Sequence, residues 1–161
     1  MLLDTLLQSW DRQAKIIANL ASLVTEANRS AKPSADGWTL SEHLGHIHEV
    51  RRHWLAKASA KHAAELPHIE THNPNLNLVD VRTALDASAA AVRAALEEAV
   101  QSEVVQFGPY DSPIYFLQHM VWHEGYHAGL ILLALRNAGQ EPTEEWDEYN
   151  IWALWRVDEW D

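Results

Sequence analysis

The sequence contains no cysteine, few basic residues and no apolar run near the ~20 residues that a membrane span needs. Without cysteine, a disulfide framework, a Cys-ligated zinc site, an iron–sulfur centre and thiol catalysis are all excluded. The 12 Lys and Arg residues against 23 Asp and Glu residues give a formal charge of −11 at pH 7. This balance argues against binding to nucleic acid or to an anionic membrane surface, because both depend on basic side chains. The N-terminal stretch carries Asp4 and lacks a basic region, so we predict no signal peptide and expect a cytoplasmic protein.

Two residue types are unusually frequent, since the sequence has ten histidines and eight tryptophans. The length of 161 residues fits one domain with a core of its own. We therefore expect a single domain, residues 1–161, with a helical body at about 2–138 and a Trp-rich tail at 139–161. Half of the tryptophans lie in this tail, at Trp146, Trp152, Trp155 and Trp160.

Apolar residues recur at alternating steps of three and four, which is typical of helices packed against one another. The pattern predicts helices over about 2–27, 40–64, 78–100 and 113–138. Local signals mark where three of them begin. Thr39 and Glu42 form a capping box, Asn77 can cap the third helix, and Ser112 precedes a proline. No strand-like alternation is present. The fold class is therefore all-α, a four-helix bundle with long connections and a short helix or tail at the Trp-rich C-terminus.

Histidines occupy the inward face of the fourth predicted helix. His123 and His127 continue the three-four alternation, and His119 lies on the same side one turn earlier. Each buried imidazole needs partners for two nitrogens, and an apolar core offers few. A metal ion would satisfy one nitrogen of each ring, whereas hydrogen bonds to side chains or water are the alternative. The spacing alone favours neither interpretation.

A third ligand is expected from a facing helix, because metal sites in bundles are built from side chains on facing helices. The second predicted helix offers His43, His46 and His53 on one stripe. His43 is nearer the apolar centre and His46 lies at its edge, and spacing does not choose between them. The remaining histidines are expected to be solvated: His48, His62, His68 and His72.

The string from His123 to His127 also matches the metalloprotease motif H-E-x-x-H, in which the glutamate is the general base. The motif is short. A protease of this class has a sheet-bearing lobe with a substrate edge strand, and this sequence has no strand signal. A zinc metalloprotease is therefore the weakest of the functional interpretations.

Two segments resemble the DinB-like (damage-inducible) superfamily. Residues 38–47, WTLSEHLGHI, are similar to W-[ST]-x-x-E-x-L-x-H-[LI], and residues 119–129, HMVWHEGYHAG, are similar to H-x-x-x-H-x-x-x-H-R-G-Q. The resemblance covers the order of all four helices, about residues 2–138. The sequence departs from it at Ala128, where the family has arginine, and at Leu130, where it has glutamine. An activity that relies on that arginine is therefore in doubt.

The resemblance implies a four-helix bundle, often a homodimer, that carries one divalent metal ion on His46, His123 and His127. The metal is expected to be Zn²⁺ or Ni²⁺, with Fe²⁺ or Mn²⁺ as alternatives. Three histidine ligands leave a coordination position open, as catalytic sites do. The implied activities are metal-dependent hydrolysis of a small amide or ester, and transfer of a low-molecular-weight thiol. A non-catalytic metal- or small-molecule-binding bundle is the alternative, so enzyme status stays open.

Two acidic residues and the tail also receive predicted roles. Glu124 is the best candidate for a catalytic base, with a solvated flank residue as the equal alternative, because it lies about 100° around the helix from His123. Glu49 is a weaker candidate for supporting the site, and a surface acid is the better interpretation. In the tail, Trp146, Trp152 and Trp155 are predicted to pack onto the bundle or a second subunit, and to wall the metal pocket or seal a dimer contact.

Overall fold

The computed structural model describes residues 2–73 and 75–157. Helices follow one another along the chain: α1 (Leu2–Leu23), α2 (Leu40–Ala58), α3 (Ala60–Ala63), α4 (Leu78–Gln101), α5 (Pro113–Asn137), α6 (Glu144–Asp147) and the π-helix η1 (Glu148–Trp152). No strand occurs in the described ranges, where Phe107 and Tyr110 form only an isolated bridge. The prediction of an all-α fold is confirmed.

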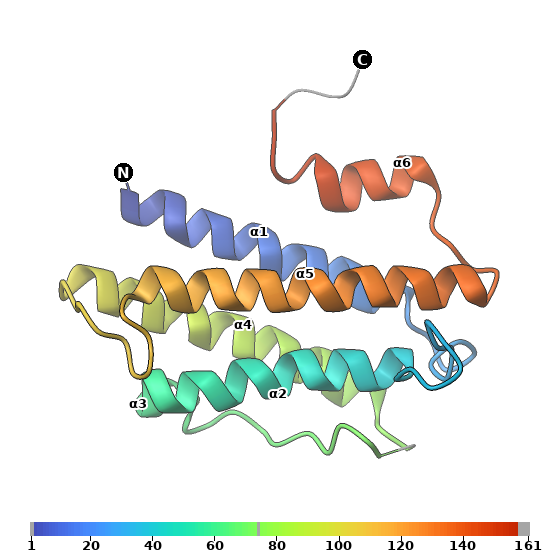
Figure 1. Ribbon diagram of the computed structural model, residues 1–161, viewed down its shortest axis with the longest axis horizontal. Coiled ribbons are helices and arrows are strands. Elements are labelled where there is room, and N and C mark those ends of the chain that lie inside the picture. Colours follow the sequence, from blue (N-terminus) through green and yellow to red (C-terminus); the bar gives the residue numbers. More distant parts are fainter. Residues whose placement is uncertain (1, 74, 158–161) are drawn as a thin grey trace.

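The four long helices lie side by side (Figure 1), with α2 packed on α4 and α5, and α1 packed on the same two helices. Three of them begin at the predicted caps. The side chain of Thr39 accepts the Glu42 amide in a complete capping box, and Asn77 and Ser112 accept amides in the first turns of α4 and α5. The caps thus set the start of each helix locally.

Two predicted helix ends were wrong. The first helix stops at Leu23 instead of residue 27, where the Asn28 side chain accepts from the Thr25 amide and donates to the Leu23 carbonyl. The second helix stops at Ala58 instead of residue 64, because Ser59 has a non-helical backbone with φ −153° and ψ 81°. The short α3 follows this break.

A layer of polar side chains divides the core into two apolar clusters. One cluster includes Ile17, Leu44 and Ile131, and the other includes Trp10 and Phe116. Along each long helix a buried polar residue lies between the two, in the order α1, α2, α4 and α5: Gln13, Arg51, Ser88 and Glu124.

The C-terminal segment is only partly packed. Ile151 is buried in one core cluster, and Trp146 packs against the same cluster. Trp152 and Trp155 are 56% and 38% exposed, so of the three tryptophans predicted to pack only Trp146 contacts this core cluster. Trp160 lies outside the described residues. A search of the described helices found none that is long and apolar enough to cross a membrane.

Candidate metal centre

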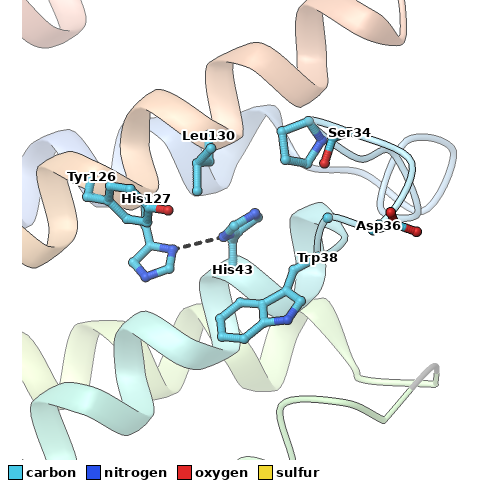
Figure 2. A pocket seen from close by; sticks show the side chains of 9 residues that line it. Ser34, Asp36, Trp38, His43, Tyr126, His127 and Leu130 are labelled. Carbon is cyan, nitrogen blue, oxygen red and sulfur yellow. Dashed lines mark hydrogen bonds between the residues drawn. The ribbon is translucent and has the colours of Figure 1, made fainter.

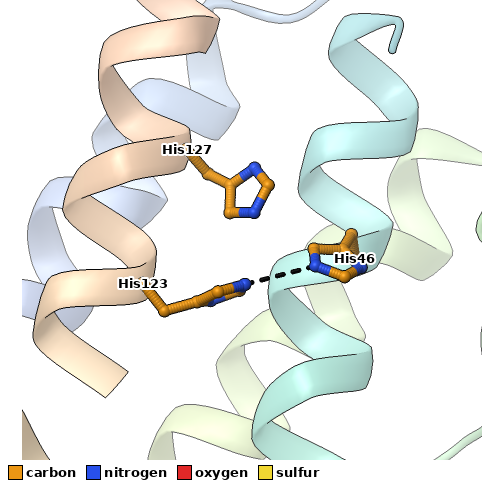
Figure 3. A group of neighbouring side chains, drawn as sticks. All are labelled: His46, His123 and His127. Carbon is orange, nitrogen blue, oxygen red and sulfur yellow. Dashed lines mark hydrogen bonds between the residues drawn. The ribbon is translucent and has the colours of Figure 1, made fainter. Parts of the chain in front are cut away.

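Three histidines from α2 and α5 project toward one another (Figure 3). His123 and His127 are one turn apart on α5, and His46 faces them from α2. One ring nitrogen of each lies within 4.8 Å of the other two, so the group could hold a metal ion. The Nε2 atoms of His46 and His123 are 3.2 Å apart. Two nitrogens bound at about 2.05 Å to one tetrahedral zinc are roughly 3.3 Å apart, so this pair fits a shared ion.

Burial keeps these rings in the neutral form that binds metal. Desolvation, followed by the charge of His46 and other neighbours, lowers the pKa of His123 to about 4. Desolvation and the neighbouring histidines lower the pKa of His127 to about 3. Burial also lowers the pKa of His46. Each ring is therefore ready to donate a lone pair at neutral pH, and the donor set suits a divalent ion with one open position.

The two histidines left open by the sequence lie beside this group and not within it. His43 is buried, and its Nδ1 is 2.9 Å from Nδ1 of His127. His119 is turned away, with its Nδ1 2.8 Å from the Tyr110 hydroxyl. Within residues 2–73 and 75–157, the group that could hold an ion consists of His46, His123 and His127.

Two of the four histidines that were expected to be solvated, His48 and His62, are less exposed than predicted. His48 was expected to be solvated, which is wrong: it is fully buried and its Nε2 is 2.8 Å from the Pro67 carbonyl oxygen. This contact ties the connection after α3 to α2. His68 and His72 are exposed as expected, and His62 is half-buried.

Glu124 is not a solvated flank residue, because its side chain is fully buried. Arg51 donates to both carboxylate oxygens, from Nε at 2.6 Å and from Nη2 at 3.0 Å, and Gln13 donates to Oε2 at 3.2 Å. The inward face of α5 thus runs through Glu124, whereas His123 is only half-buried at its edge. Glu49 accepts the Ile69 amide and pairs with Arg52 and His68, so its carboxylate is not available to His46, His123 or His127.

Arg51 is the residue at the centre of the molecule that the sequence analysis missed. Its signal was present, because Leu44, Ile47, Arg51 and Leu55 step by three, four and four along α2. A charged residue at an inward position of one helix needs a partner of opposite charge at an inward position of another. The structure supplies Glu124 in that role.

A pocket of about 300 Å³ opens beside His127 (Figure 2). The loop at 33–38 lines one side, Tyr126 and Leu130 of α5 line the other, and His43 of α2 lies between them. The Trp38 ring stacks on His127 with centroids 6.0 Å apart and an interplanar angle of 6°. The described residues of the tail do not line this pocket, so the predicted wall of tail tryptophans is replaced by Trp38.

A comparison with models of protein families shows to which family the chain belongs. The family model described as the DinB family matches residues 1–153. The chain belongs to the DinB family. The match confirms the resemblance and extends it past residue 138, so α6 and η1 fall within the DinB region. Searches of curated proteins and of solved structures gave no match.

Proposed function

We propose that His46, His123 and His127 bind one divalent metal ion, and that this protein is a metal-dependent hydrolase or thiol transferase acting on a small molecule. The proposal includes the DinB-like four-helix bundle as the frame that holds the ligands. The observation that carries it is the approach of three neutral imidazole nitrogens, from two facing helices, within 4.8 Å of one another. The adjoining pocket supports access by a small ligand.

When bound, such an ion lowers the pKa of a coordinated water toward about 7 and polarises a substrate oxygen. The chain's own residues hold and shape the site. The histidines supply the lone pairs, and Trp38 covers one face of His127. Asp36 is the acidic residue of the pocket lining. Since Arg51 holds both oxygens of Glu124, we propose a structural role for Glu124 in place of the catalytic base expected from the sequence.

This role also removes the support for a protease of the H-E-x-x-H class. That chemistry needs a glutamate free to activate water beside the metal. Here the glutamate is fully buried and points to Arg51. The part of the chain that the structure describes also holds no strand to which a peptide substrate could add.

Elemental analysis of purified protein tests the metal site. We expect close to one divalent ion per chain in the wild type and a negligible amount in His123→Ala. His53→Ala is the matched control, since His53 is an exposed histidine of α2 outside the group, and it should retain the metal. Equal and negligible metal in all three proteins would contradict the proposal. Reconstitution with zinc, nickel, iron and manganese then ranks the four ions by affinity. This step is needed because the affinity of a site depends on the identity of the metal as well as on the ligands.

Turnover separates the enzyme from a non-catalytic metal- or small-molecule-binding protein. A panel of low-molecular-weight thiols with electrophiles, and of small esters and amides, should reveal one reaction that depends on added metal. Metal binding without any such turnover supports the binding protein.

We also propose a homodimer that forms through the outer face of α5. From Ile114 to Leu133 the exposed residues of this helix carry no formal charge, although the whole chain has −11. They recur at a spacing that suits packing against another helix: Tyr115, Gln118, Trp122, Gly125, Gly129 and Leu133. Gly125 and Gly129 have open space where a Cβ would lie, so a second helix can approach closely.

Sedimentation velocity at micromolar concentration tests this contact. We expect a dimer for the wild type and a monomer for Trp122→Glu, since Trp122 is 76% exposed and the change places a charge on the contact face. The helix content of the variant, measured by circular dichroism, should equal that of the wild type, so that loss of the dimer is not due to unfolding. A monomeric wild type would contradict the proposal.

A further inference from the structure

His43 and His127 form a pair in which one ring must donate a hydrogen bond to the other. Their Nδ1 atoms are 2.9 Å apart, which is a hydrogen-bond distance. Both rings are buried, which favours the neutral form. A neutral imidazole has one N–H donor and one acceptor nitrogen, so one Nδ1 must donate and the other must accept.

The direction of this hydrogen bond follows from the proposed metal site, on which this step rests. Since Nδ1 of His127 faces His43, Nε2 is the nitrogen of His127 left for the metal. A neutral ring that binds metal through Nε2 carries its hydrogen on Nδ1. His127 therefore donates to Nδ1 of His43. The hydrogen of His43 must then sit on its own Nε2.

That second nitrogen of His43 is the unexplained group. Nε2 is buried and has no hydrogen-bond partner among the described residues. His43 is 2% exposed, yet its ring lines the pocket. Figure 2 shows the nitrogen that does not face His127 on the side of the loop that carries Ser34. A buried donor without an acceptor is unfavourable, so a ligand that offers an acceptor there would be stabilised.

We propose that His43 is a positioning residue that holds His127 in its metal-binding tautomer and presents its Nε2–H to the carbonyl oxygen of a neutral or cationic small molecule in the pocket. The charge of the ligand follows from its surroundings. Asp36 in the lining disfavours an anion beside the His43 Nε2–H, whereas the bound ion would draw an anion to its own open position. The rings of Trp38 and Tyr126 offer flat apolar walls for the remainder of the molecule.

The tautomers are measured directly by nitrogen-15 NMR of the imidazole rings in zinc-loaded wild-type protein. We expect the hydrogen of His127 on Nδ1 and that of His43 on Nε2. The reverse assignment at either ring would overturn the proposal. This measurement needs no variant, so it stands even if a substitution impairs folding.

Zinc affinity tests the positioning role. We expect His43→Phe to bind zinc 10- to 100-fold more weakly, because His127 loses its partner. In His43→Asn the side-chain oxygen takes the place of Nδ1 as acceptor, so most of the affinity should return. His53→Phe on the same helix is the control and should bind zinc as the wild type does. If the wild type binds zinc and His43→Phe binds it equally well, the inference fails while the metal site stands. If the wild type binds no zinc, the proposed function itself fails.

Benzamide and benzoate probe the ligand class, because they share a ring and differ in charge. We expect benzamide to shift the His43 Nε2–H resonance of the zinc-loaded wild type, whereas benzoate, whose carboxylate is drawn to the zinc, should shift it less. Binding should weaken in His43→Phe. A larger shift of this resonance with benzoate, or no effect of benzamide on His43, would overturn the assignment of the ligand.

Discussion

At the scale of single residues, the most constrained group in the molecule is the polar layer between the two apolar clusters. Arg51 donates from Nη1 to the Leu85 carbonyl at 2.9 Å and lies 5.0 Å from the centre of the Trp10 ring, in addition to its two bonds to Glu124. Ser88 lies 3.4 Å from the same Nη1. A buried ion pair of this kind is tolerated because its hydrogen-bonding capacity is met.

Removing one partner of this pair should be costly. Glu124→Gln leaves the Arg51 charge buried without compensation, for an expected loss of about 3–5 kcal/mol in the free energy of unfolding. At about 2–4 °C per kcal/mol for a domain of this size, the melting temperature should fall by roughly 10 °C. The double change Arg51→Met with Glu124→Leu removes both charges and should cost much less. Calorimetry of the variants measures both, with Glu97→Gln at an exposed ion pair as the control. A wild-type melting temperature in Glu124→Gln would contradict this account.

This layer also shows what the sequence could reveal about individual residues. Two histidines one turn apart on an apolar helix were visible from spacing, and the family resemblance chose His46 as the third. The burial of Glu124 was not visible, because His123 and Glu124 are neighbours and either one continues the three-four alternation. The choice depends on Arg51, which is 73 positions earlier in the chain. The spacing of α2 signals a buried Arg51, but it does not show which acidic residue is the partner.

At the scale of secondary-structure elements, two glycines mark turns that only glycine fits well. Gly108 has φ +58°, and a Cβ there would lie 2.5 Å from the Ala58 Cα and from the Lys57 carbonyl oxygen. The connection before α5 is therefore pressed directly onto the end of α2. Gly139 follows α5 with φ +68°, but a Cβ at this position would have nothing within 4 Å of it.

The two positions form a matched pair. Gly139→Ala should lower the free energy of unfolding only by the backbone strain of the left-handed conformation, about 1–2 kcal/mol. Gly108→Ala has the same strain and in addition forces the α2 end and the connection apart, so its melting temperature should fall at least twice as far. Thermal melting of both variants compares the losses. Equal decreases in melting temperature would show that the backbone near Ala58 can move to accommodate the added methyl group without loss of stability.

Helix termini were predictable where the residues that fix them are close in the sequence. The starts of α2, α4 and α5 agree with the sequence prediction because Thr39, Asn77 and Ser112 cap helices through side chains only two or three residues away. The end of α1, which the sequence placed too late, involves a distant part of the chain. Asn28, which closes the turn after α1, also donates to the Gln140 side chain at 2.7 Å, a contact across 112 positions.

At the scale of the whole molecule, the C-terminal segment joins the rest of the chain through a few contacts (Figure 1). The Asn19 side chain of α1 donates to the Asn150 carbonyl at 2.9 Å. Ile151 is 7% exposed within a core cluster, and Trp146 and Leu154 pack against it. The exposed side chains of Trp152, Glu144 and Glu145 face solvent around these contacts. Ile151 is therefore a buried contact that holds this segment against the core cluster.

Truncation after Pro142 removes this anchor and should expose the apolar surface beneath it. We expect a loss of about 1–2 kcal/mol, which lowers the melting temperature by several degrees in a domain of this size. Trp152→Ala is the control, because a side chain that is 56% exposed contributes little to the stability of one chain. Oligomeric mass is measured on the same samples. A dimer that forms through α5 stays a dimer on truncation and becomes a monomer in Trp122→Glu. A dimer that forms through the tail shows the opposite pattern. If the truncated protein has the melting temperature and the oligomeric state of the wild type, the tail is a loose appendage. The packing of Ile151 and Trp146 then contributes nothing to the stability of the fold.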